Sequence, residues 1–195
     1  MNDRADPRLE KFAAEAPTGG IVGMPYGLDD NSASILKAST SRPNDDLLEA
    51  TAHHVIISLS EVKFLLAEAY ERGILTGDAQ KAYEEGIRAP MEYWGISDAD
   101  VINNYISAQS YNGSNWKASI GIQKWISIYT SGKEALAEWR RLDQPVLEPS
   151  PNGVVSSIPT KMPYPQSERT NNATSLGAVS SNPINITAKV WWDVN

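Results

Sequence analysis

The side chains best suited to ligand chemistry in this sequence are aromatic. The chain holds six Trp and eight Tyr but only two Phe. Trp and Tyr combine a flat apolar face with a polar group, and a sugar ring offers apolar C–H faces surrounded by hydroxyls. Tyr111 and Trp116 flank a Gly/Asn/Ser-rich turn, and Tyr93 and Trp94 end a predicted helix. We predict these four as ligand-contacting residues, with packing as the alternative for each.

For the other four tryptophans the sequence predicts burial or packing rather than ligand contact. Trp125 and Trp139 fall at the spacing of buried helix positions, so we expect them to pack in the core. Trp191 and Trp192 are consecutive near the C-terminus. In an extended chain they would point in opposite directions, so we expect one to be more buried than the other.

The sequence contains few residues suited to metal binding or nucleophilic catalysis. His53 and His54 are consecutive, and consecutive side chains diverge in a strand or a helix, so we expect a loop or strand entry rather than a metal site. The chain has no Cys, no HExxH, no GxSxG, no Walker loop and no GxGxxG. We therefore predict no catalytic residue, no metal and no cofactor.

Carboxylates are plentiful, so an enzyme remains as an alternative. A glycoside hydrolase of the helical class would need two carboxylates converging across a cleft. Glu61, Glu68 and Glu138 lie beside apolar helix faces. We expect these three to cap helices or to pair with the arginines at 72, 140 and 141 rather than to act as acid and base.

Composition excludes several classes of partner. The net charge is −7, from 24 acidic and 17 basic residues, and no Lys/Arg cluster occurs, which argues against nucleic acid. Without Cys there are no disulfides. No apolar run approaches the roughly eighteen residues that span a bilayer, and the first sixteen residues have no apolar stretch of the signal-peptide type.

Three zones divide the chain. Residues 1–55 are mixed, with a short helix predicted near 7–15 and a loop that contains several glycines after it. Residues 56–143 show helical periodicity. Residues 144–195 are expected to be turn and extended structure, with prolines at 159, 163 and 165 that no helix interior tolerates. The predicted fold is mainly α, with long irregular loops and little β, in one region spanning 1–195.

The helical zone opens with a hairpin. Ser58 and Glu61 have capping-box spacing, and Gly73 suits the position after a helix. Asp78 can cap a second helix, in which Pro90 predicts a kink or an early end. The two helices resemble a tetratricopeptide unit, which leaves part of its surface for a neighbour to cover. Further helices are predicted from Ser97, over 116–130 and over 133–142.

Four segments together resemble one family. They are the hairpin at 60–97, IGIQKWISIYTSGKEALAEWRR, IPTKMPYPQSERTNNA and the closing KVWWD. In this order they are similar to the C-terminal part of SusD/RagB-type proteins, the nutrient-binding outer-membrane lipoproteins of Bacteroidetes. The stretch from Asp6 to Gly27 is similar to the family's segment before its last repeat helices.

The resemblance implies a non-enzymatic binding protein. Such a protein captures a glycan or other nutrient at the cell surface and works with a TonB-dependent SusC-type transporter. It also implies that the proline-rich tail packs on the helices. Family members begin with a signal peptide and a lipidated Cys, which this chain lacks, so we expect it to be a fragment of a surface lipoprotein.

Two further expectations concern partners. A hairpin without its stacking neighbours exposes an apolar face, so the fragment is expected to be able to self-associate. A helical-repeat module that binds proteins and no small ligand is the alternative to glycan binding.

Overall fold

The computed structural model describes residues 4–152 and 156–193. Its described helices are α1 (Leu9–Phe12), α2 (Asp30–Leu36), η2 (Asp45–Leu47), α3 (Leu59–Glu71), α4 (Ala79–Tyr93), α5 (Ala99–Ala108), η3 (Gly113–Asn115), α6 (Trp116–Ser127), α7 (Gly132–Leu142), α8 (Gln166–Asn171) and α9 (Ala173–Val179). Within these ranges the β structure is a single bridge between Ala13 and Pro43. The predicted mainly α fold is confirmed.

Helices α3 and α4 form the predicted hairpin, and both predicted caps are present. The Ser58 hydroxyl oxygen accepts from the Glu61 amide at 3.1 Å, and the Asp78 carboxylate accepts from the Lys81 amide at 2.9 Å. The helices approach closely where Phe64 faces Gly86. A Cβ at residue 86 would lie 2.8 Å from the Phe64 ring, so only glycine fits there without displacing the ring.

Helix α4 does not end at Pro90, so of the two outcomes predicted there the early end is wrong, and the kink stays a prediction. The helix continues to Tyr93. Pro90 has no N–H to donate to the Gly86 carbonyl one turn earlier. The Ser60 hydroxyl, which is buried on α3, donates to that carbonyl at 2.7 Å. Tertiary contact therefore supplies the hydrogen bond that the proline removes.

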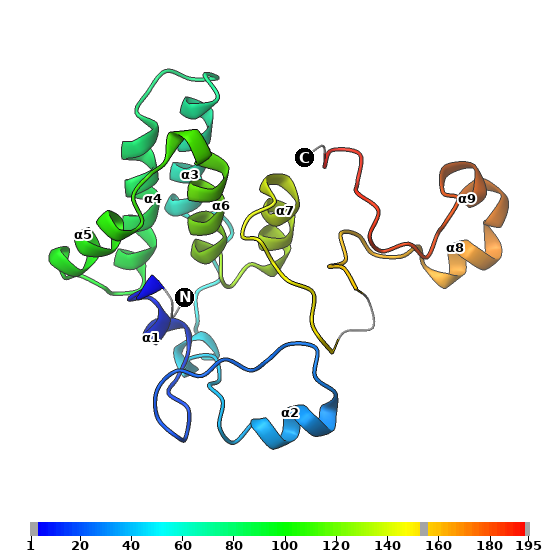
Figure 1. The fold of residues 1–195 in the computed structure, drawn as a ribbon, viewed down its shortest axis with the longest axis horizontal. Coiled ribbons are helices and arrows are strands. Elements are labelled where there is room, and N and C mark those ends of the chain that lie inside the picture. Colours follow the sequence, from blue (N-terminus) through cyan, green and yellow to red (C-terminus); the bar gives the residue numbers. More distant parts are fainter. Residues whose placement is uncertain (1–3, 153–155, 194–195) are drawn as a thin grey trace.

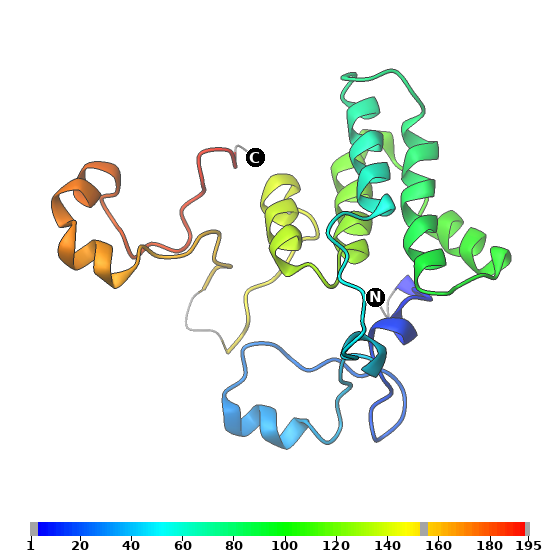
Figure 2. The same cartoon turned by 180° about the vertical axis from the view of Figure 1, so that it is seen from behind.

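Helices α5, α6 and α7 complete a compact body with the hairpin, which we call the helical body (residues 59–142; Figure 1). Its core is a cluster of buried apolar residues from four helices: Phe64, Ala67, Ala82, Tyr83, Ile87, Met91, Ile102, Tyr105, Ile106 and Ile120. The opposite view shows α3 and α4 side by side, with α5 on the outer side of the lower part of α4 (Figure 2).

The N-terminal segment is anchored to this body by a buried polar network. Arg8 is fully buried and donates to both carboxylate oxygens of Asp6, at 2.9 and 2.7 Å. It also donates to Gln123 on α6 at 3.1 Å, and the Tyr105 hydroxyl on α5 donates to Asp6 at 2.8 Å. Burial alone would raise the pKa of Asp6, but hydrogen bonds and charge from Arg8 outweigh it and hold the pKa below its ordinary value.

The N-terminal zone differs from its prediction in two places. The helix expected near 7–15 is only one turn long, since α1 ends at Phe12. A second helix, α2, lies within the predicted loop. The Asp29 carboxylate starts it by accepting from the amides of Asn31 and Ser32, both at 3.0 Å.

The tail (residues 144–152 and 156–193 as described) is tied to the body at few points. Within it, the amides of Thr160 and Tyr164 donate to the carbonyls of Ile186 and Pro183, at 2.8 and 2.9 Å. Arg140 of α7 donates to the Thr160 carbonyl at 2.8 Å, and its guanidinium lies 4.9 Å from the centre of the Trp192 ring. These contacts fix the extended parts of the tail against α7.

The tail also contains α8 and α9, where the sequence predicts turns and extended chain. These two short helices contact each other and lie to one side of the helical body in both views (Figures 1 and 2). The three prolines at 159, 163 and 165 all precede α8, where none of them removes a hydrogen bond from a helix interior.

Candidate functional site: two aromatic hollows

The last turn of α4 presents an aromatic pair beside the N-terminal segment. The Trp94 ring meets Phe12 edge-on with centroids 5.2 Å apart, and Phe12 stacks on Tyr129 at 4.4 Å. Tyr93 meets the Trp94 ring edge-on at 5.3 Å and is 56% exposed. Trp94 is thus fixed by packing, and it in turn positions Tyr93 as a flat surface open to solvent.

Two depressions meet at this pair, and together we call them the Tyr93 hollow. One, of about 420 Å³, lies between residues 55–61, the end of α4 and residues 127–131. The other, of about 750 Å³, is lined by residues of the 46–55 segment together with Tyr93, Trp94 and Thr130. Their volumes are in the range of small-molecule sites, about 300–1,000 Å³.

The polar groups of the larger depression come from the 46–55 segment and from Thr130, and the smaller one adds serines and glutamates, namely Ser58, Ser60, Glu61, Glu92, Ser127 and Ser131. Asp46, His53 and His54 line the larger depression with exposed side chains. His53 and His54 lie in a loop, as predicted. In the part of the chain that the structure describes, no three His, Cys, Asp or Glu side chains gather as metal ligands. The hollow thus offers hydroxyl, imidazole and carboxylate groups around an aromatic surface.

Tyr111 and Trp116 occupy a different place. Both are half-buried and pack against the core cluster, and neither lines the Tyr93 hollow. The Tyr111 hydroxyl donates to the Glu71 carboxylate at 2.6 Å, and its ring lies 5.2 Å from that of Tyr83. Burial and this hydrogen bond raise the pKa of Tyr111. The structure therefore brings Tyr93 and Trp94 together and places Tyr111 and Trp116 elsewhere.

The helix carboxylates pair with cations, as predicted for Glu68 and Glu138. Arg141 donates to both oxygens of Glu68 and to both oxygens of Glu138, the latter at 3.2 and 2.7 Å. Lys124, which is buried, lies 3.1 Å from Glu138, and Arg72 lies 3.1 Å from Glu68. Burial alone would raise the pKa of Glu138, but Arg141 and Lys124 outweigh it and lower the pKa. This cluster joins α3, α6 and α7.

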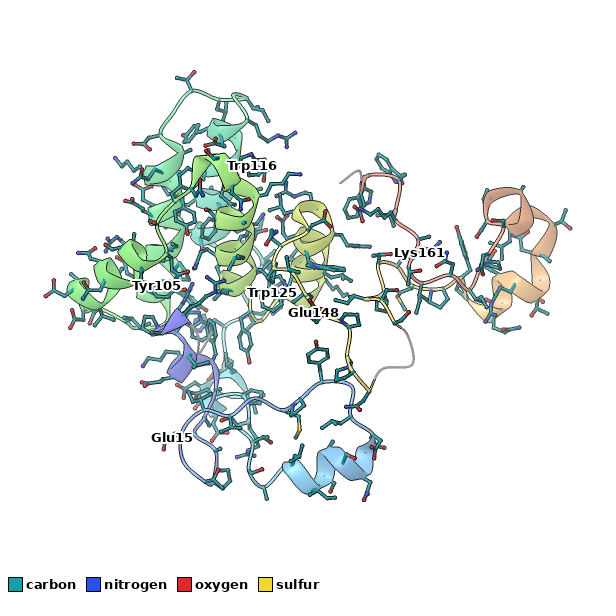
Figure 3. The ribbon with its side chains drawn as sticks, viewed as in Figure 1. Glu15, Tyr105, Trp116, Trp125, Glu148 and Lys161 are labelled. Carbon is teal, nitrogen blue, oxygen red and sulfur yellow. The ribbon has the colours of Figure 1, made fainter. Side chains whose placement is uncertain are left out.

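A second hollow was not predicted from the sequence. It measures about 470 Å³ and is lined by Tyr26, Trp125 and residues from 147–150 and 157–159. Trp125, expected in the core, is half-buried, and Figure 3 shows it near Glu148, at the other end of α6 from Trp116. We call this second depression the Tyr26–Trp125 hollow. Tyr26 follows a proline in a glycine-rich loop, a context that signals an exposed aromatic.

The helical body and its two aromatic hollows define a mainly α protein with surfaces suited to binding. The chain belongs to the SusD-like family described as "Starch-binding associating with outer membrane", whose model matches residues 1–165. The predicted resemblance is confirmed, and this family is one of binding proteins associated with the outer membrane. In the described part of the chain, no helix is long and apolar enough to cross a membrane.

Solved structures share the fold over the whole chain. A SusD homologue from Bacteroides vulgatus superposes with a TM-score of 0.85 at 23% identity, covering 100% of this chain and 47% of its own. One from Bacteroides thetaiotaomicron gives 0.82 at 24%, covering 100% and 50%. A structure titled "chitin-binding protein" gives 0.78 at 29%, covering 100% and 48%.

The chain spans about half the length of these solved relatives. No curated protein matches it.

Proposed function

We propose that this chain binds oligosaccharide in the Tyr93 hollow and takes part in nutrient uptake at the outer membrane. The observation that carries the proposal is the Tyr93 ring. It is open to solvent, held by the packed Trp94 ring, and bordered by polar side chains of the 46–55 segment. The starch-binding description of the family supports a saccharide as the ligand.

The geometry suggests how each group would act. The Tyr93 face would cover the apolar C–H side of a pyranose ring, and the edge contact with Trp94 would keep it in place. Asp46, His53 and His54 would exchange hydrogen bonds with hydroxyls. The two depressions that meet at Tyr93 would allow more than one sugar unit. We infer capture without cleavage, in keeping with the binding role in the family's description.

Titration calorimetry with starch-derived and chitin-derived oligosaccharides tests the proposal. Tyr93→Ala is expected to weaken the affinity by about two- to twelve-fold, the effect of an aromatic contact worth about 0.5–1.5 kcal/mol. Trp191→Ala is the matched control, because Trp191 is 90% exposed and lies outside the hollow. Its affinity should equal that of the wild type. Failure of every oligosaccharide to bind, or equal affinity for Tyr93→Ala, would refute the proposal.

The proposal also covers the membrane anchoring and the partner of the complete protein. We propose that the complete protein is a surface lipoprotein that works with a TonB-dependent SusC-type transporter. Family membership supports this setting. Co-purification of the complete protein with such a transporter from outer membranes is the expected result, and recovery of the protein without any transporter would contradict it.

A second candidate function is self-association through α3, and one observation favours it. Leu59, Val62 and Leu65 are 62%, 41% and 46% exposed at helical spacing, on the side of α3 away from Phe64. A second copy presents the same apolar row and can cover it. Light scattering should show dimers that Val62→Glu converts to monomers. A monomeric wild type would exclude this candidate.

A further inference from the structure

The Tyr26–Trp125 hollow is built so that its Tyr26 ring is held in place. The Tyr26 hydroxyl donates to the Glu148 carbonyl at 2.6 Å, and the Ser150 hydroxyl donates to the Tyr26 carbonyl at 2.8 Å. These two bonds join the loop around residue 26 to a segment more than a hundred residues later. Tyr26 is nevertheless 60% exposed, so its ring is held in place yet open to a ligand.

These two hydrogen bonds occupy hydroxyl groups of the hollow that could otherwise donate to a ligand. The Tyr26 hydroxyl hydrogen and the Ser150 hydroxyl hydrogen are both donated within the protein. The remaining lining consists mostly of aromatic faces and of aliphatic side chains, namely Leu147, Pro149, Ile158 and Pro159. Among the described lining residues, Glu148 carries the one charge, and its exposed carboxylate can accept a hydrogen bond. Ser157 adds a hydroxyl to the lining, so a ligand group that fits must be mainly apolar and can carry one donor for Glu148.

We propose that this hollow binds the acetamido group of an N-acetylated hexosamine unit. The methyl of that group is apolar, and its amide N–H is a single donor that the Glu148 carboxylate can accept. A glucose unit carries a hydroxyl in its place, which can also donate to Glu148 but brings no methyl group to bury against the aliphatic lining. The inference rests on the proposed binding of oligosaccharide and names the class of sugar that the chain selects.

Chitotetraose and cellotetraose form the matched pair for the test, because both are β-1,4-linked and differ by the acetamido groups. In calorimetric titration of the wild-type chain, chitotetraose should bind at least about four-fold more tightly, the effect of burying one methyl group. Tyr26→Ala should remove this preference. Tyr26→Phe keeps the ring and should retain most of it. Tyr93→Ala should weaken both ligands about equally.

The variants are suited to the purpose because Tyr26 lies in an exposed loop outside the helical body. Far-UV circular dichroism should therefore be unchanged in both Tyr26 variants. Equal affinity of the wild type for the two ligands would overturn the inference and leave the proposed function standing. A preference that survives in Tyr26→Ala would overturn it as well. No binding of either ligand would overturn this inference, and the proposed function falls with it when the starch-derived oligosaccharides also fail to bind.

Discussion

Replacing Ser60 by alanine tests how α4 tolerates a proline in its interior. The Ser60 hydroxyl is buried and donates to the Gly86 carbonyl at 2.7 Å, the acceptor that Pro90 leaves without its usual N–H donor. Ser60→Ala would leave this carbonyl buried and unsatisfied. The cost of such a group is about 1–3 kcal/mol, so we expect the free energy of unfolding to fall by about 2 kcal/mol.

A double-mutant cycle makes the reasoning specific. Pro90→Ala restores an N–H at residue 90 that can bond the Gly86 carbonyl within the helix. In that background Ser60→Ala should cost less than in the wild type, with a coupling of at least about 1 kcal/mol. Urea denaturation followed by circular dichroism gives the four free energies of unfolding, and unchanged m-values would show that the unfolded state is unaffected.

Ser127→Ala is the matched control. The Ser127 hydroxyl donates to the Lys124 carbonyl at 2.7 Å, but that carbonyl also accepts from the Ile128 amide at 3.1 Å. Removing the hydroxyl leaves no unsatisfied acceptor, so the expected change is within about 0.5 kcal/mol. If Ser60→Ala costs the same with proline or alanine at residue 90, the role assigned to Ser60 is refuted.

Two other properties follow from the charged contacts. Asp6 and Glu138 have pKa values held below their ordinary 3.8 and 4.5, so the stability they contribute is present above these values and is lost as pH falls through the lowered, folded-state pKa values. Thermal unfolding between pH 6 and pH 2 should show this loss, and a melting temperature independent of pH would contradict it. Arg140→Ala removes the donor to the Thr160 carbonyl and the cation over Trp192, so limited proteolysis should cut the tail faster while the helical body survives. An unchanged cleavage rate would show that Arg140 does not hold the tail.

The helical body could be predicted from the sequence because its helices depend on interactions between residues close together in the chain. The Ser58 and Asp78 caps depend on residues three positions apart, and both form as predicted. The pairing of Glu68 with Arg72 is also local, since the two lie one turn apart on α3. Amphipathic periodicity then placed α3 to α7, because each must bury one face.

Where the sequence failed, the deciding contacts join distant parts of the chain. Tyr111 looks exposed in its turn-rich loop, yet its hydroxyl reaches Glu71 forty residues earlier. Pro90 looks like a helix end, yet a serine on the neighbouring helix supplies the missing hydrogen bond. Arg8 carries a charge but is fully buried, because its Nε and Nη2 bond Asp6 and its Nη2 also bonds Gln123, although its Nη1 has no partner in the described part of the chain. No local sequence pattern predicts contacts between residues this far apart in the chain.

The candidate site likewise combines residues that could be predicted from local sequence with contacts that could not. Tyr93 and Trp94 were singled out because they end a helix, but their relation to the 46–55 segment depends on how the loop folds back. The half-buried position of Trp125 depends on residues 147–159 of the tail. The short helices α8 and α9 carry few apolar residues, since Leu176 is the one buried side chain recorded in them, so periodicity gave no signal.

The central claim is that an oligosaccharide binds against the Tyr93 ring. A crystal structure of the chain soaked with chitotetraose, and in parallel with maltotetraose, tests it most directly. The account predicts density for a pyranose ring lying flat on Tyr93, with hydroxyls near His53, His54 or Asp46. Density for sugar only at sites away from Tyr93, or none at a concentration that saturates binding in solution, would contradict the account.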